Sequence, residues 1–411
     1  MRTHIIRKSA IKILFVLSVL FLSAVFVAGP ASADRIKVGV VLPLTGKLAN
    51  YGEIEKNSFL MAAEEINAAG GVNGQAIDLI IEDTGGKPDK GRSAIEKLIF
   101  QERVIVVGGG CSSQVTDKIA ALTQQHKIPF LINTASSDVI TKTERTFVFR
   151  LNPPASEYAN TLGAFIKSLG TIKTAALLYE RCPFGPYYCF ATSRLKMFEK
   201  MCKKVGIHTV TKRRYDAGVN DFIPLLTKIK SNNPDLVYLI TNDAIDASTI
   251  LHQAKAVYLN PKIFFYGGTA ATLPEFQKNA GPASDYVFSA TLWTPSVPYP
   301  GAKAYYDKFA AKYNATTEYH GAEAYAGMYV IADALKRAKA LTREGVRDAL
   351  ATTDMMTVFG PVKFFSYDNM TQQNRLPTLL VQWINGKLET VWPEYVSTHK
   401  YVYPVPAWDQ R

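Results

Sequence analysis

Small polar residues follow a run of three glycines at 108–110, and their types suit anion binding. The stretch GGGCSSQVTDKI covers residues 108–119 and places Ser112 and Ser113 at the expected start of an amphipathic helix. The first turn of a helix presents unpaired backbone N–H groups and the positive end of the helix dipole. The loop before the helix has no lysine of the kind that phosphate-binding loops use, so it favours a carboxylate over a polyphosphate. Helix capping by Ser112 or Ser113 is the alternative explanation.

A second loop repeats this chemistry. IPFLINTASSDVI, residues 128–140, runs from an apolar segment into Thr134, Ala135, Ser136 and Ser137. In an open α/β sheet, ligands bind outside the carboxyl ends of the strands, where neighbouring loops converge. We therefore expect the two loops to hold one carboxylate from both sides.

The elements that position these loops alternate in type along the chain. Short β-branched segments predict strands, and they lie at 36–42, 76–83, 103–109, 128–133, 174–179, 235–240 and 262–268. Longer segments with apolar residues at helical spacing lie between them. This alternation predicts parallel sheets covered by helices on both faces. A proline-rich segment, 286–300, indicates a crossing between two such units.

The first 33 residues read as a signal peptide. A basic start precedes the apolar run 13–29, and Ala31-Ser32-Ala33 matches the small-residue pattern of a cleavage site. We expect export of the chain with cleavage after Ala33, so that Asp34 begins the mature protein. An uncleaved membrane anchor is the alternative, because a run of this length spans a bilayer marginally.

Composition and motifs exclude several function classes. The chain has 411 residues and a net charge of +12, and its basic residues are scattered apart from a patch at 196–214. An exported chain without a nucleic-acid motif is a poor candidate for nucleic-acid binding, whereas a positive field favours anionic ligands. The GxSxG, HExxH and GxxxxGK[ST] motifs are missing, and the histidines show no metal-ligand spacing. We expect no enzyme activity, cofactor or metal.

Four cysteines remain after export into an oxidising compartment. Cys189 and Cys202 fall on one expected helix about 20 Å apart, too far for a disulfide. Cys182 and Cys189 bracket a turn-rich segment, PFGPYY, and can pair.

Several quoted stretches together resemble one family. IKVGVVLPLTGKLANYG (36–52), INAAGGVNG (66–74), GGGCSSQVT, IPFLINTASS and FRLNPP are similar to the periplasmic leucine/isoleucine/valine-binding proteins. The resemblance covers nearly the whole mature chain. It implies a type I periplasmic binding fold, with two doubly wound parallel-sheet lobes joined by three crossovers that close on a ligand. The N-terminal lobe would comprise 34–152 and 293–362, and the C-terminal lobe 153–292 and 363–411.

The resemblance also implies a set of site residues. In the first lobe it assigns the ligand carboxylate to Ser112, Ser136 and Ser137, an ammonium acceptor to the backbone of Ala135, and the pocket wall to Tyr51, Gly110 and Cys111. In the second lobe the family positions fall on Phe184, Asn242 and Thr269. His320 and Tyr325 are further aromatic candidates for the wall.

Two of these positions depart from the family pattern. Asn242 stands where the family has a tyrosine, and Thr269 stands where it has the glutamate that pairs with the ligand ammonium. An unpaired buried ammonium is strongly unfavourable, so Asp243 is a candidate substitute. The residues that align with the family partner of Cys111 are Gly85 and Gly86, which implies a free thiol at Cys111.

The resemblance implies a monomeric receptor that delivers a small carboxylate to an ABC-type membrane permease. The ligand is either a branched-chain or other apolar amino acid, or an amine-free acid such as an aromatic carboxylate, which needs no acidic partner. A ligand-sensing module is a second functional class.

Overall fold

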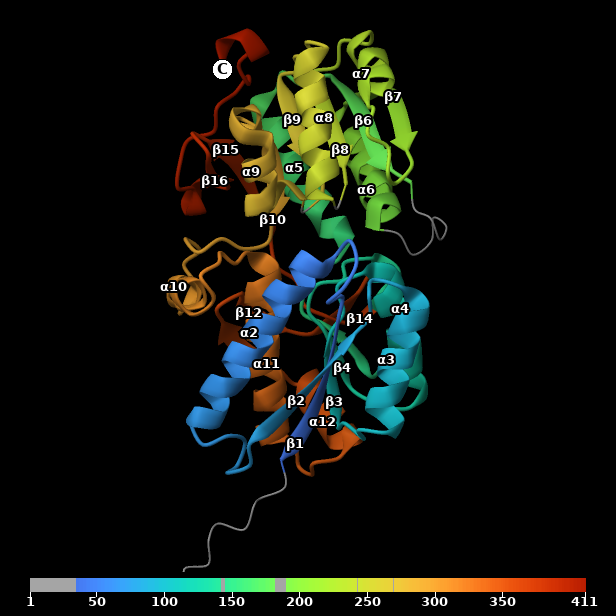
Figure 1. Ribbon diagram of the computed structural model, residues 1–411, viewed down its shortest axis with the longest axis vertical. Helices are drawn as coiled ribbons and strands as arrows, with labels where there is room; N and C mark the ends of the chain where they lie inside the picture. Colours follow the sequence, from blue (N-terminus) through green and yellow to red (C-terminus); the bar gives the residue numbers. More distant parts are fainter. Residues whose placement is uncertain (1–34, 142–144, 182–189, 242, 269) are drawn as a thin grey trace, which may run out of the picture.

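The protein is described from a computed structural model that covers residues 35–141, 145–181, 190–241, 243–268 and 270–411. Two α/β lobes are stacked along the long axis of the molecule (Figure 1). Each lobe is built on one seven-stranded sheet. Within the described part of the chain, no helix combines the length and hydrophobicity needed to cross a bilayer.

The first sheet has the strand order β13-β14-β5-β4-β3-β1-β2. Its strands are β1 (Ile36–Leu42), β2 (Ile77–Asp83), β3 (Val106–Gly109), β4 (Phe130–Ile132), β5 (Val148–Arg150), β13 (Phe365–Tyr367) and β14 (Met370–Gln373). All neighbours are parallel except β13 and β14. The register pairs Val41 with Gly109, Gly109 with Ile132, and Ile132 with Arg150. The carboxyl ends of these four strands therefore lie level, and the loops after them share one edge.

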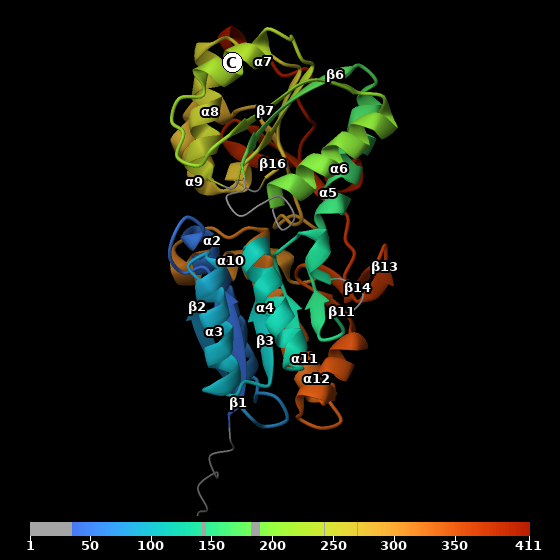
Figure 2. The ribbon, with the colours of Figure 1, turned by 90° about the vertical axis from the view of Figure 1, so that its right-hand side faces the viewer.

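Helices cover both faces of the first sheet. One face carries α2 (Ala49–Ala68) and α11 (Tyr319–Arg337), and the other carries α3 (Pro88–Phe100) and α4 (Ser113–Gln125), as Figures 1 and 2 show. β1 is apolar on both sides for this reason: Val40 packs in the core under α2 and α11, whereas Val41 packs under α3 and α4. The lobe also contains α10 (Ala302–Tyr313), α12 (Arg343–Ala351) and the short helix η1 (Asp138–Thr141).

The second sheet has the order β16-β15-β10-β9-β8-β6-β7. Its strands are β6 (Thr174–Glu180), β7 (His208–Tyr215), β8 (Leu236–Ile240), β9 (Ile263–Tyr266), β10 (Phe288–Thr291), β15 (Leu379–Ile384) and β16 (Lys387–Trp392). The neighbouring strands β7, β6, β8, β9 and β10 are parallel, and β15 is antiparallel to β10 and β16. Helices α5 (Ala155–Leu169) and α6 (Phe190–Val205) pack together, and the other helices of the lobe are α7 (Ile223–Lys230), α8 (Ala244–Ala256) and α9 (Pro274–Ala280).

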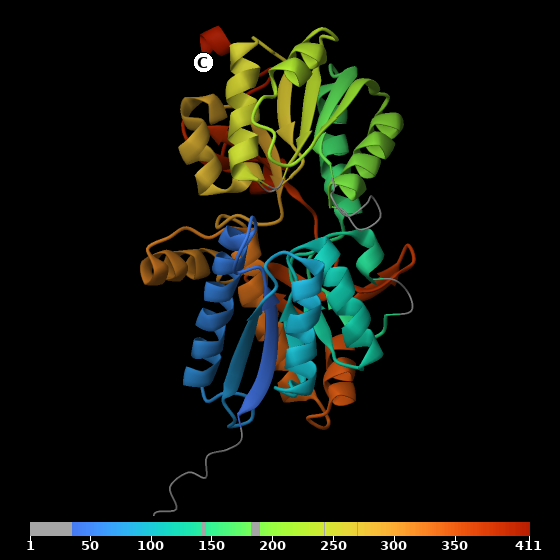
Figure 3. The same cartoon turned by 45° about the vertical axis from the view of Figure 1, so that its right-hand side comes forward.

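The chain passes between the two sheets three times: after β5, after β10 and after β14. Figure 3 shows these segments at the waist between the lobes. The predicted fold class is confirmed, with antiparallel strands added at the sheet edges. A separate two-stranded ribbon, β11 (Asp354–Thr357) with β12 (Gly360–Lys363), follows α12.

The last crossing differs from the predicted boundary after residue 362. β13 and β14 pair with the first sheet, so the chain leaves that sheet after Gln373. Asp368 and Asn369 both have positive φ, 48° and 63°, and make the tight turn of this hairpin. Such a turn is a local signal for two antiparallel strands. The sequence gives no local signal for which lobe the hairpin joins, because its partner β5 lies more than 200 positions away.

Candidate functional site

The loop after β3 owes its shape to two glycines. Gly109 and Gly110 have φ values of +107° and +90°, which side-chain-bearing residues rarely adopt. A Cβ on Gly109 would lie 2.4 Å from the carbonyl oxygen of Val41. The turn leads directly to Cys111 and to Ser112, the N-cap residue of α4. Among the described residues, the Ser112 hydroxyl accepts no capping hydrogen bond from the helix, so capping does not account for this serine.

Backbone hydrogen bonds hold the loop after β4 against this turn. The amide of Asn133 donates to the carbonyl of Gly109 at 3.1 Å, and the amide of Ala135 donates to that of Gly110 at 2.9 Å. The amide of Ser137 donates to the hydroxyl of Ser113 at 3.3 Å. The two loops predicted to converge therefore lie in contact.

The hydroxyl of Ser137 is buried without a hydrogen-bond partner among the described residues. Burying an unpaired hydroxyl costs about 1–3 kcal/mol. Ser136 is also buried, and its carbonyl accepts a hydrogen bond from the amide of Ala155 at 2.7 Å. The unpaired oxygen of Ser137 thus marks a place where an additional polar group would be stabilising.

Arg150 lies fully buried at the end of β5 and supports the same loop. Its guanidinium donates to the carbonyl of Ser137 at 2.6 Å and that of Ala135 at 3.4 Å, and its Nε donates to Gln373 at 2.5 Å. Burial lowers the pKa of Arg150 to about 10, so it stays positively charged at neutral pH. The Ala135 carbonyl, predicted to accept a ligand ammonium, already accepts from this cation. Arg150 was not among the predicted site residues, although it lies in the quoted FRLNPP stretch.

Glu55 is a second residue at this site that was not predicted from the sequence. It is fully buried on α2 and accepts hydrogen bonds from Nδ2 of Asn133 at 3.0 Å and from the hydroxyl of Thr134 at 2.9 Å. Burial raises the pKa of Glu55 to about 7. A signal was present in the sequence, because Glu55 shares the inward face of α2 with Tyr51 and Phe59.

His320 and Tyr51 meet beside Glu55. The two rings lie 4.5 Å apart between centroids, and Nδ1 of His320 lies 2.8 Å from the Glu318 carboxylate. Cys111 lies near them as a free thiol, as predicted. Its pKa is raised by burial and by the charge of Glu55. Tyr51, Cys111 and His320 are therefore neighbours at one edge of the first lobe.

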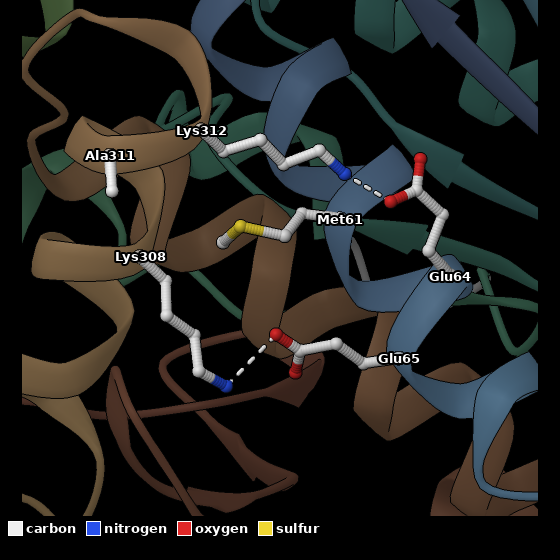
Figure 4. Close-up of a pocket in the computed structure, with 6 residues that line it drawn as sticks. All are labelled: Met61, Glu64, Glu65, Lys308, Ala311 and Lys312. Atoms are coloured by element: carbon white, nitrogen blue, oxygen red, sulfur yellow. Dashed lines mark hydrogen bonds and ion pairs between the residues drawn. The ribbon is translucent and has the colours of Figure 1, made fainter.

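Tyr325 does not join this group. Its hydroxyl donates to Glu65, a residue that lines a separate hollow of about 410 Å³ between α2 and α10. In that hollow Lys308 and Lys312 point at Glu65 and Glu64, respectively, and form ion pairs with them (Figure 4). These charges are satisfied by each other, and none of the predicted ligand-binding residues lines the hollow.

In the second lobe, the predicted residues Phe184, Asn242 and Thr269 lie outside the described residues, as do Cys182 and Cys189. Asp243 is described, and it caps α8: its Oδ1 accepts hydrogen bonds from the amides of Ile245 at 2.8 Å and Asp246 at 3.2 Å. Its Oδ2 lies 3.7 Å from Nζ of Lys47. A ligand ammonium at Asp243 would therefore compete with two existing interactions.

Polar and apolar contacts join the two lobes at this edge. Lys47 faces Asp243 across the junction, and Nδ2 of Asn50 donates to Glu275 on α9 at 2.5 Å. Tyr51 and Cys111 pack against a hydrophobic cluster formed mainly by second-lobe residues. The serine loops of the first lobe therefore lie at the boundary between the lobes.

Comparisons with known proteins agree with this architecture. A family model described as periplasmic binding protein matches residues 35–387. The leucine-, isoleucine-, valine-, threonine- and alanine-binding protein of Pseudomonas aeruginosa is 30% identical over 346 residues, which is 83% of this chain and 90% of that protein.

Two solved structures share the fold. A branched-chain amino acid transporter substrate-binding protein from Streptococcus pneumoniae, in complex with isoleucine, has a TM-score of 0.77 and 24% identity and covers 88% of this chain and 100% of its own. A solute-binding protein of an ABC transporter from Rhodopseudomonas palustris, in complex with 3,4-dihydroxybenzoic acid, has a TM-score of 0.76 and 19% identity over 91% of this chain and 99% of its own. The family model, the similar sequence and the shared fold confirm the resemblance, and the chain belongs to the periplasmic binding protein family.

Proposed function

We propose that this protein is an exported solute-binding protein that captures a small carboxylate between its lobes and delivers it to an ABC-type membrane permease. The observation that carries this proposal is the unpaired, buried hydroxyl of Ser137 on two loops that are fixed to each other. The names of the similar proteins support the transport role. Release of the signal peptide after Ala33 would free the protein into the periplasm.

The carboxylate would bind at the serine loops. Ser112 and Ser137 offer hydroxyl donors, and the start of α4 adds backbone N–H groups and the positive end of a helix dipole. Arg150 adds a buried positive charge directly behind the Ser137 carbonyl. Each of these groups stabilises an anion, and together they favour a carboxylate at the interlobe boundary.

We propose a branched-chain or other apolar amino acid as the ligand, because the similar protein from P. aeruginosa is named for such amino acids. An amine-free aromatic acid is the alternative, and the likeness to a protein in complex with 3,4-dihydroxybenzoic acid supports it. The engagement of Asp243 by the α8 cap and by Lys47 also favours this alternative. A sensing role uses the same site and differs in the membrane partner.

Thermal-shift screening of the purified mature protein against both ligand panels tests the ligand class. A bound ligand at 100 times its dissociation constant adds about 2.7 kcal/mol of stability, which such a screen detects. Stabilisation by apolar amino acids supports the proposal, and stabilisation by aromatic acids alone selects the alternative. Stabilisation by neither panel, in protein first stripped of bound solute by denaturation and refolding, argues against a small-carboxylate receptor.

A further inference from the structure

Three side chains of different chemistry converge beside the serine loops. A carboxylate oxygen of Glu55, the sulfur of Cys111 and a ring nitrogen of His320 all lie within 4.8 Å of one another. They come from α2, the turn after β3 and the first turn of α11. The three donors are far apart in the sequence and are brought together only by folding. The spacing of cysteines and histidines along the chain therefore gives no sign of a metal site.

We propose that Glu55, Cys111 and His320 bind a zinc ion. Thiolate, imidazole and carboxylate are the three donor types of protein zinc sites, and three protein ligands leave a fourth position for water. A thiolate ligand disfavours magnesium and calcium, which prefer oxygen donors. Glu55 and His320 are buried, whereas Cys111 is partly exposed, so the open position would lie on the Cys111 side.

The surrounding contacts hold two of the donors in place. The Glu318 carboxylate lies 2.8 Å from Nδ1 of His320, which leaves Nε2 for the metal. A carboxylate partner of this kind orients metal-binding histidines and increases their basicity. Asn133 and Thr134 each donate one hydrogen bond to Glu55, and a carboxylate has about four acceptor positions. Glu55 can thus bind a metal without losing either support.

The acidic surroundings of the three donors also favour a cation at this place. Glu318 contacts the ring of His320, and Glu323 follows His320 by about one turn on α11. Glu323 is fully buried, and neither of its carboxylate oxygens has a hydrogen-bond partner among the described residues. The nearby Thr134 hydroxyl donates its hydrogen bond to Glu55 instead. A divalent cation in this group would compensate carboxylates that are otherwise costly to bury.

Zinc titration of chelator-treated protein by calorimetry tests the site, with cobalt as a spectroscopic probe. We expect about one equivalent of zinc to bind, and cobalt to show a thiolate-to-metal charge-transfer band. Cys111→Ser should abolish that band and weaken zinc binding at least tenfold, and His320→Ala should also weaken it at least tenfold. Glu318→Gln removes the negative charge beside the His320 ring and leaves an amide oxygen that can still cap α11; it should lower zinc affinity roughly 10–100-fold.

Three controls make the outcome decisive. Cys202→Ser removes the other described free cysteine, which is buried on α6, and should leave the cobalt band unchanged. Ser137→Ala should keep zinc binding while it loses solute affinity, so this proposal and the proposed function can fail separately. Circular dichroism establishes that each variant is folded. Absence of stoichiometric binding, or binding that survives both Cys111→Ser and His320→Ala, would overturn the zinc site.

Discussion

Replacing Ser137 by alanine should stabilise the ligand-free protein and weaken solute binding. The Ser137 hydroxyl is fully buried and has no hydrogen-bond partner in the described part of the chain. Alanine removes this unsatisfied group, whereas the backbone contacts of the loop, including the 2.6 Å bond from Arg150 to the Ser137 carbonyl, remain. A serine with a structural hydrogen bond would show the opposite effect on stability.

The two effects have separate magnitudes. An unsatisfied buried hydroxyl costs about 1–3 kcal/mol, and the small cavity left by the lost oxygen offsets part of this gain. A net gain of about 1 kcal/mol would raise the melting temperature of a lobe of this size by about 2–4 °C. The lost hydrogen bond to a ligand carboxylate is worth about 1.5–3 kcal/mol, which corresponds to roughly a 10–100-fold loss of affinity.

Differential scanning calorimetry of the ligand-free variant and titration calorimetry with the bound solute measure these two quantities. Ser113→Ala is the matched control, because the Ser113 hydroxyl accepts a hydrogen bond from the amide of Ser137 at 3.3 Å. That variant should lower the melting temperature. A Ser137→Ala protein that melts at a lower temperature and binds solute with unchanged affinity would refute the reasoning.

The remaining predictions concern the second lobe, acid stability and export. Asp243→Asn should keep the α8 cap and bind solute with nearly unchanged affinity. Asp243→Ala removes the cap and should lower the free energy of unfolding, measured by chemical denaturation, by about 1 kcal/mol. Loss of amino-acid binding in Asp243→Asn would instead identify Asp243 as the partner of the ligand ammonium. Burial acts to raise the pKa of Asp83, but hydrogen bonds from Thr45, Gly85 and Leu44 outweigh it, so the pKa is lowered. The stability that Asp83 contributes is therefore present above its unfolded pKa of about 3.9 and is lost as pH falls through the lower folded value. Asp83→Asn should be less stable than the native protein at pH 7 and should lose less stability on acidification. An identical acid transition in both proteins would contradict this. N-terminal sequencing of the exported protein should begin at Asp34, and the presence of residues 1–12 would show an uncleaved anchor.

The fold was predictable because its signals are local. Alternating β-branched and amphipathic segments identify the strands and helices, and parallel strands of this kind must place their following loops at one edge. The serine loops at 112–113 and 134–137 follow from the same reasoning. The register of Gly109 with Ile132 brings them into contact as expected.

The supporting residues were less predictable, because their roles depend on contacts between distant segments. Arg150 is held by a hydrogen bond to Gln373 on β14, and Glu55 accepts hydrogen bonds from Asn133 and Thr134. A charged residue on the apolar face of an expected helix was the available signal for Glu55. Asp243 was a candidate partner for a ligand ammonium because of its position next to Asn242. Its carboxylate caps the helix that follows it, which the position in the sequence alone did not indicate.

The central claim is that the serine loops bind a carboxylate, and a paired titration tests it most directly. Isothermal titration calorimetry compares the acid that stabilises the protein most in the ligand screen with its primary amide, which has nearly the same shape and no negative charge. We expect binding of the acid and at least a tenfold weaker affinity for the amide, because the helix dipole, the Ser137 hydroxyl and Arg150 all favour an anion. Equal affinity for acid and amide would contradict it.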